Sequence, residues 1–143
     1  VSEAAGGAPN ASTVSSYNVN GGGMLSVISA SAPTMQTAAC WIALDRFGRH
    51  AYTTNTGSGT ISGFSVSFAG ALTLLDADGI TASTGPGSAP IDMALTRRGR
   101  YLYSLNGGDN PTITGFRVSN DGSLEPVEVL GGIPAGANGL AAR

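Results

Sequence analysis

Short apolar runs separated by small and turn-forming residues recur along the whole chain. Two of them, 61–66 and 113–118, alternate between large apolar and small or polar residues. This alternation predicts β-strands that carry their large side chains on one face. Two others, 41–44 and 91–95, are continuous runs of mostly apolar residues, which favours strands buried on both faces.

These runs belong to an internal repeat. Residues 42–80 resemble residues 93–132, and the matches lie first 51 and then 52 positions apart. The matched pairs are Gly48 and Gly99, Tyr52 and Tyr103, Asn55 and Asn106, Phe64 and Phe116, Gly70 and Gly122, and Leu72 and Leu124. A partial third copy precedes them, in which Tyr17, Gly23 and Leu25 lie 47 positions before Phe64, Gly70 and Leu72. A repeat of this length usually marks a repeated unit of structure.

Each complete unit predicts four short strands. The first is the apolar run, the second contains Tyr52 or Tyr103, the third alternates, and the fourth follows a turn such as Asn120-Asp-Gly122. A repeated four-stranded unit of about 50 residues is typical of a β-propeller blade, whereas a β-sandwich has no reason to repeat at this period. We therefore predict an all-β chain of about three β-propeller blades, each of four antiparallel strands.

The repeat also divides the chain. We assign 1–143 to a single β-propeller segment, in which 1–36 supply the second to fourth strands of a partial blade. Residues 37–87 and 88–134 form two full blades, and 135–143 form the first strand of a next or shared blade. Propellers typically have 4–8 blades. We therefore expect either a missing remainder of the same protein or a homo-oligomer, in which one chain's last strand completes another chain's first blade.

Composition and net charge limit the classes of binding partner that the chain can have. Gly, Ala, Ser and Thr make up about half of the 143 residues, which suits closely stacked inner strands. Seven arginines and nine acids give a net charge of −2, without the basic stripe that nucleic-acid binding needs. No apolar run approaches the roughly 18 residues of a membrane span, so we expect no membrane partner. The absence of lysine, with so much Ser, Thr and Gly, favours a periplasmic or secreted location over a cytoplasmic one.

The pattern Ala-Leu-x-x-x-Gly-Arg-x-x-Tyr-x-x-Asn, followed by Thr-Ile-x-Gly-Phe-x-Val-Ser-x-x-Gly-x-Leu, resembles the lactonase-type β-propellers, the 6-phosphogluconolactonase and carboxymuconate cyclase-like family. The resemblance covers nearly the whole chain and implies about three blades of a seven-bladed ring. It also implies a central pocket lined by Arg, His and Glu side chains on the loops that enter the first strands. The corresponding positions here, 39–41, 90–92 and 137–139, carry no cation.

Three polar residues are candidates for lining that pocket as binding contacts. Asp92 lies inside a predicted first strand, where burial of an unpaired acid is costly, so it should face the pocket or a hydrogen-bond partner. Asn138 occupies the corresponding segment near the C-terminus, and Glu3 resembles a glutamate that some family members carry at the end of a second strand. No catalytic residue is assigned.

Other chemistry-bearing residues favour structural roles. The single histidine, His50, rules out a multi-histidine metal site, and the glycine clusters lack dinucleotide and Walker spacings, so we expect no cofactor and no metal. Cys40 cannot form an internal disulfide and is expected to be a small buried apolar residue. Arg46, Arg97 and Arg98 are either solvated loop charges or contacts for an anion.

Two functional hypotheses remain open. The first is a portion of a lactonase-like propeller whose parent hydrolyses or forms a sugar or muconate lactone, a small-molecule ligand, at the central pocket. The second is a non-enzymatic propeller that serves as a binding or structural module. The absence of cations at the first-strand positions favours the second, and the repeat does not distinguish them.

Overall fold

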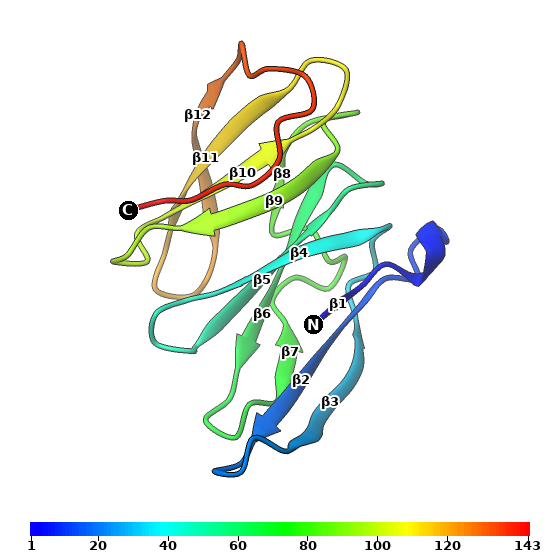
Figure 1. Ribbon diagram of the computed structural model, residues 1–143, viewed down its shortest axis with the longest axis vertical. Helices are drawn as coiled ribbons and strands as arrows, with labels where there is room; N and C mark the ends of the chain where they lie inside the picture. The colour runs from blue at the N-terminus through cyan, green and yellow to red at the C-terminus, as the bar shows by residue number, and fades with distance from the viewer.

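Three antiparallel sheets follow one another along the chain and stack along its longest axis, as Figure 1 shows for the computed structural model of residues 1–143. The sheet that comes first in sequence, blade 1, contains β1 (Ser2–Glu3), β2 (Thr13–Val19) and β3 (Leu25–Pro33) in that order. A short 3-10 helix, η1 (Ala5–Gly7), lies between β1 and β2.

The second and third sheets are the complete blades. Blade 2 contains β4 (Ala39–Leu44), β5 (His50–Asn55), β6 (Thr60–Val66), β7 (Leu72–Leu74) and β8 (Ala82–Ser83). Blade 3 contains β9 (Pro90–Leu95), β10 (Tyr101–Asn106), β11 (Thr112–Val118) and β12 (Leu124–Leu130). In blade 3 all four strands pair in chain order, and in blade 2 β4 to β7 do so while β8 pairs with β6, so the all-β fold of antiparallel β-propeller blades is confirmed.

The fourth strand of blade 2 is divided. Residues 75–81 interrupt it, and β7 pairs with the end of β6 while β8 pairs with its beginning. The sequence predicted a single fourth strand in each complete unit, whereas blade 2 has two short strands there.

Two hydrophobic clusters lie between the blades. Between blades 1 and 2, Val14 packs with Ala51 and Phe64. Between blades 2 and 3, the buried residues are Tyr52, Ile61, Met93, Leu102, Phe116 and Leu124. Phe64 and Phe116, which occupy the same repeat position, thus each pack against the preceding blade.

One detail of the predicted third strand is wrong. Ile61 and Phe64 do not share a face, since Ile61 belongs to the cluster shared with blade 3 and Phe64 to the cluster shared with blade 1. A blade has a neighbour on each side, so both faces of its third strand carry apolar residues.

The turn between the third and fourth strands ties each blade to the one before it. Glycine carbonyls in two of these turns accept hydrogen bonds from the preceding blade, namely Gly70 from the Ser16 hydroxyl (2.7 Å) and Gly122 from the Tyr52 hydroxyl (2.9 Å). Gly122 has φ +90°, and a Cβ built there would lie 2.6 Å from Cδ2 of His50. Glycine at this position therefore allows both the turn and the close approach of the blades.

Two expectations about the inner edge of blade 2 are not met. The first strand of blade 2 is mostly exposed or half-buried instead of buried on both faces, and Cys40 within it is exposed. The second strand, β5, is the fully buried one. Residues 135–143 run alongside β9 without forming a strand within this chain, and their assignment as the first strand of a next or shared blade stays a prediction (Figure 1).

Candidate functional site

Glu3 lies at the end of β1, and its carboxylate accepts hydrogen bonds from hydroxyl groups of its own blade. Its Oε1 accepts a hydrogen bond from Ser15 (2.6 Å), and its Oε2 accepts from Thr13 and from Ser31 (3.2 Å). The hydrogen bond from Ser15, followed by that from Thr13, lowers the pKa of Glu3, with partial burial opposing the change. Glu3 is therefore held as an anion whose two oxygens are both engaged.

Asp92 is buried in β9 and is satisfied by backbone groups. Its Oδ1 accepts a hydrogen bond from the N–H of Met93 and its Oδ2 accepts one from the N–H of Leu140, each at 2.6 Å. These bonds offset the cost of burying the carboxylate. The second bond fixes the C-terminal segment beside the first strand of blade 3.

Asn138 is exposed and its side chain makes no hydrogen bond within the chain. Because Leu140 is bonded to Asp92, the segment that carries Asn138 lies near the start of β9. Glu3 bonds only to residues of blade 1, so no hydrogen bond or ion pair joins it to Asp92 or Asn138.

The surface between these residues is apolar. A hollow of about 290 Å³ is lined by Val1, Ser2, Cys40, Trp41 and Ile42. The Sγ of Cys40 lies 3.4 Å from the carbonyl oxygen of Ile91, which links the first strands of blades 2 and 3. This end of the blades presents a wall of apolar and neutral polar groups, without a pair of acidic and basic side chains that are free to react.

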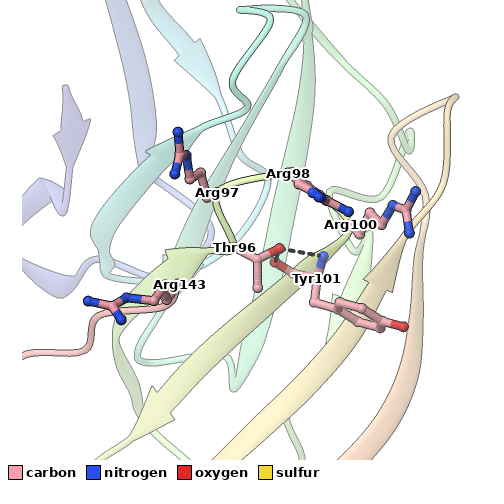
Figure 2. A pocket seen from close by; sticks show the side chains of 6 residues that line it. All are labelled: Thr96, Arg97, Arg98, Arg100, Tyr101 and Arg143. Atoms are coloured by element: carbon pink, nitrogen blue, oxygen red, sulfur yellow. Dashed lines mark hydrogen bonds between the residues drawn. The ribbon is translucent and has the colours of Figure 1, made fainter.

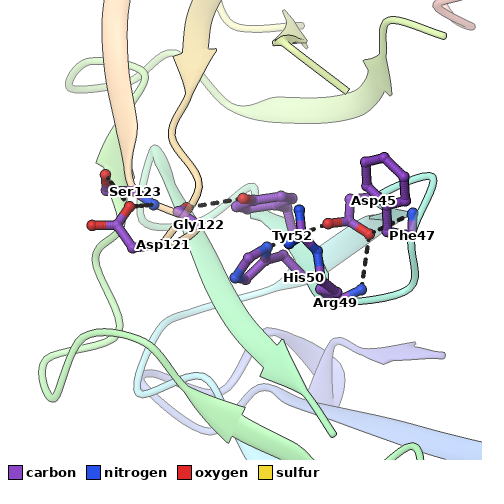
Figure 3. Close-up of polar contacts among 8 residues, drawn as sticks. All are labelled: Asp45, Phe47, Arg49, His50, Tyr52, Asp121, Gly122 and Ser123. Carbon is purple, nitrogen blue, oxygen red and sulfur yellow. Dashed lines mark hydrogen bonds and ion pairs between the residues drawn. The ribbon is translucent and has the colours of Figure 1, made fainter. Parts of the chain in front are cut away.

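The opposite end carries the turns that join first to second strands and third to fourth strands, and we call it the turn end. There Asp45 accepts hydrogen bonds at Oδ1 from the N–H groups of Phe47 (3.0 Å) and Arg49 (2.8 Å), while its Oδ2 lies 3.3 Å from Nδ1 of His50 (Figure 3). His50 is buried against the turn that contains Gly122. This geometry gives His50 a structural position between two blades.

Tyr52 completes this group of polar contacts. Its hydroxyl is buried and donates to the Gly122 carbonyl, as Figure 3 shows. Burial, followed by the negative charges of Asp45 and Asp121, strongly raises the pKa of Tyr52. The hydroxyl therefore stays protonated and remains a hydrogen-bond donor.

Arginines surround this group at the turn end. One hollow there is lined by Thr96, Tyr101 and four arginines (Figure 2). The sequence indicated part of this cluster, because Arg46 and Arg97, like Arg49 and Arg100, occupy equal repeat positions. No three His, Cys, Asp or Glu side chains lie close enough together to hold a metal ion.

The sheets and their inter-blade contacts define the chain as a run of β-propeller blades. It is similar in structure to a protein of unknown function from Desulfotomaculum acetoxidans, with a TM-score of 0.68 and 20% identity over 82% of this chain and 34% of that chain. It is also similar to the periplasmic gluconolactonase of Pseudomonas aeruginosa, with a TM-score of 0.67 and 20% identity over 89% of this chain and 38% of that chain.

A third similar structure is a candidate 6-phosphogluconolactonase from Bacteroides uniformis, with a TM-score of 0.63 and 17% identity over 82% of this chain and 36% of that chain. The chain thus shares the fold of these proteins and spans between 34% and 38% of their length. No protein-family model and no curated protein matches the sequence.

The structure contains no helix with the length and apolar character needed to cross a membrane.

Proposed function

We propose that the chain is a three-blade portion of a lactonase-like β-propeller, whose whole protein hydrolyses or forms a sugar or muconate lactone at a central pocket. The observation that carries this proposal is the similarity in fold to a gluconolactonase over 89% of the chain. Ring opening of a lactone needs fixed cations for the developing anion and a general acid or base. The chain supplies no cation at its first-strand positions, and its one acid there, Asp92, is buried and hydrogen-bonded to backbone groups, so its contribution is one wall of the pocket.

Within that wall, Asp92, Asn138 and Glu3 act as polar binding contacts. Both carboxylates are occupied by hydrogen-bond donors of the chain itself, which suits a role in shaping the wall. Asn138 is the one of the three with a free side chain, and its amide can both donate to and accept from a sugar hydroxyl.

The alternative function is a non-enzymatic binding or structural module. It is favoured by the occupied carboxylates of Glu3 and Asp92 and by the apolar hollow beside Trp41. Under this alternative the same wall binds a small molecule without changing it.

An activity assay separates the two functions. The full chain at micromolar concentration is incubated with δ-6-phosphogluconolactone or δ-gluconolactone, and acid release is followed in a pH-stat against spontaneous hydrolysis. A rate above the spontaneous one that falls in Asn138→Ala and is kept in Asn18→Ala, an exposed asparagine of β2, supports lactonase chemistry. Absence of any enhancement contradicts an activity of the isolated chain and leaves the binding function.

We also propose a periplasmic or secreted location. It is supported by the composition of the chain and by the periplasmic location of the similar gluconolactonase. Fractionation of the source cells with an antibody against the chain tests it, and a purely cytoplasmic signal contradicts it.

The internal repeat supports a further proposal, that the isolated chain associates with a second copy of itself. Phe116 and Leu124 are 1% and 9% exposed because blade 2 covers them. Tyr17 and Leu25 hold the same repeat positions in blade 1, which no blade precedes in this chain, and are 38% and 67% exposed. An apolar face that is covered in the next two blades is thus open in blade 1.

Blade 3 presents the complementary face. Tyr52 and Ile61 of blade 2 are fully buried against blade 3, whereas Tyr103 and Ile113, at the same repeat positions of blade 3, are only partly buried. The partly buried face of blade 3 in one copy can therefore pack against the open apolar face of blade 1 in a second copy, in the way that blade 2 packs against blade 3 within the chain. This is a head-to-tail interface, which forms either a closed ring or an open chain.

Size-exclusion chromatography with light scattering tests the association. We expect the wild-type chain to exceed 14.2 kDa and the variant Leu25→Asp to shift to a monomer. Phe68→Asp is the matched control, since Phe68 is exposed in a turn outside both faces and its loss should leave the association unchanged. A wild-type chain that stays a folded monomer at all concentrations contradicts the proposal.

A further inference from the structure

The arginines of this chain gather at the turn end. Arg46 and Arg49 lie in the turn 45–49, and Arg97, Arg98 and Arg100 lie in the turn 96–100 of the next blade. A Cβ built on Gly99 would lie 3.9 Å from Cγ of Arg46, so the two turns adjoin. Arg143 lines the same region, so six of the seven arginines share it in a chain whose net charge is −2.

No acidic side chain neutralises this cluster. The only charged pairs within 4.0 Å are Asp45 with His50 and Arg117 with Glu125, and neither includes an arginine of the two turns. Asp45, the acid nearest in sequence, already accepts two backbone N–H bonds and faces His50. The positive charges of the turn end therefore lack a partner within the chain.

The cluster also has a concave shape. One hollow of about 480 Å³ is lined by Arg46, Arg97 and Arg98 alone. The adjoining hollow drawn in Figure 2, of about 270 Å³, has no acidic side chain in its lining. A third of about 190 Å³ extends to His50 and to Asp45, whose carboxylate is already hydrogen-bonded to backbone N–H groups. Arg98 lines all three hollows.

Two features limit the freedom of the turns and their side chains. The guanidinium carbons of Arg46 and Arg49 lie 4.6 and 5.0 Å from the centre of the Phe47 ring, at the distance of cation–π contacts. In the other turn, the hydroxyl of Thr96 accepts the N–H of Tyr101 at 3.2 Å and closes the hairpin. Cations that are held close together before binding lose less entropy when a ligand arrives.

We propose that the turn end is a binding site for a small anion that carries two or more phosphate or carboxylate groups. Guanidinium groups bind both through paired N–H donors, and an anion with several charges is needed to bridge arginines of two turns. The site lies at the end of the blades opposite Asp92 and Asn138, and it does not rest on the lactonase proposal.

Isothermal titration calorimetry of the full chain at low ionic strength tests this site, with pyrophosphate and citrate as separate probes. We expect saturable binding of at least one of them, weakened about tenfold in Arg98→Gln, because a charge-assisted hydrogen bond to the anion is lost. Tighter binding of pyrophosphate identifies a phosphate site, and tighter binding of citrate identifies a carboxylate site. Arg98 is exposed, and far-UV circular dichroism verifies that the variant is folded.

Arg117→Gln is the matched control. It removes the same charge from an exposed arginine that is paired with Glu125 at 3.6 Å, outside the hollows. Unchanged affinity in this variant supports a localised site. Equal weakening in both variants would show an effect of net charge alone, and that result, like the absence of saturable binding at millimolar probe, overturns the proposal.

Discussion

Replacing Gly122 with alanine should destabilise the chain by loosening the contact between blades 2 and 3. The new Cβ would lie 2.6 Å from Cδ2 of His50 and 2.8 Å from Cδ1 of Leu75. The leucine methyl group can move, but the His50 ring is buried and held by Asp45. Overpacking of this kind costs about 1–3 kcal/mol. The positive φ adds about 1–2 kcal/mol for a residue with a side chain, so we expect a total of about 2–5 kcal/mol.

The repeat supplies a control for each part of this cost. Gly23 and Gly70 occupy the same repeat position, with φ +79° and +85°. A Cβ at Gly23 meets nothing within 4 Å, so Gly23→Ala isolates the backbone cost of about 1–2 kcal/mol. A Cβ at Gly70 meets only the end of the Ile28 side chain, at 2.7 Å, so Gly70→Ala should fall between the other two variants.

Urea unfolding followed by far-UV circular dichroism measures these differences, with the midpoint and its slope fitted for each variant. We expect Gly122→Ala to be the most destabilised variant, Gly70→Ala to be intermediate and Gly23→Ala to be the least destabilised. If Gly122→Ala proved no less stable than Gly23→Ala, the close approach of the two blades would be refuted.

Three further predictions concern single residues. Phe116→Ala should cost about 3–5 kcal/mol in urea unfolding, because the side chain is fully buried between blades 2 and 3. The pKa of Glu3 is lowered below its ordinary value of 4.5. Its stabilising contribution is therefore complete above pH 4.5 and is lost as the pH falls through the folded-state pKa. Glu3→Gln should flatten the acid limb of a profile of unfolding free energy against pH. Asp92→Asn should speed hydrogen exchange of the Leu140 amide about tenfold or more, because a charged acceptor is lost; an unchanged rate would contradict the bond between them.

The strands were largely predictable because turn residues mark their ends. The alternating runs at 61–66 and 113–118 differ from β6 and β11 by one residue at the start. The faces of the strands were less predictable. Ile61 and Phe64 are three positions apart, which puts them on opposite faces of a strand, and a blade between two neighbours buries both faces.

The environment of the candidate site depends on contacts that sequence patterns do not contain. Asp92 was expected to face the pocket or a partner, but its partner, the N–H of Leu140, lies 48 residues further on. The exposure of Cys40 has a similar cause, since burial of a first strand requires elements on the far side of a ring. The arginine cluster was partly predictable, because the repeat places Arg46 and Arg97 at equal positions of adjacent blades.

Each of the two hydrophobic clusters is formed by residues of two adjacent blades, so no single blade contains a complete hydrophobic core. Three sheets in a row have two such interfaces, whereas a closed ring has as many interfaces as blades. In an array of this kind, stability is approximately the sum of the units and their nearest-neighbour contacts. Each added blade then brings one interface, and the blade that closes the ring brings two, so the last duplication in such a gene contributes more stability than any before it.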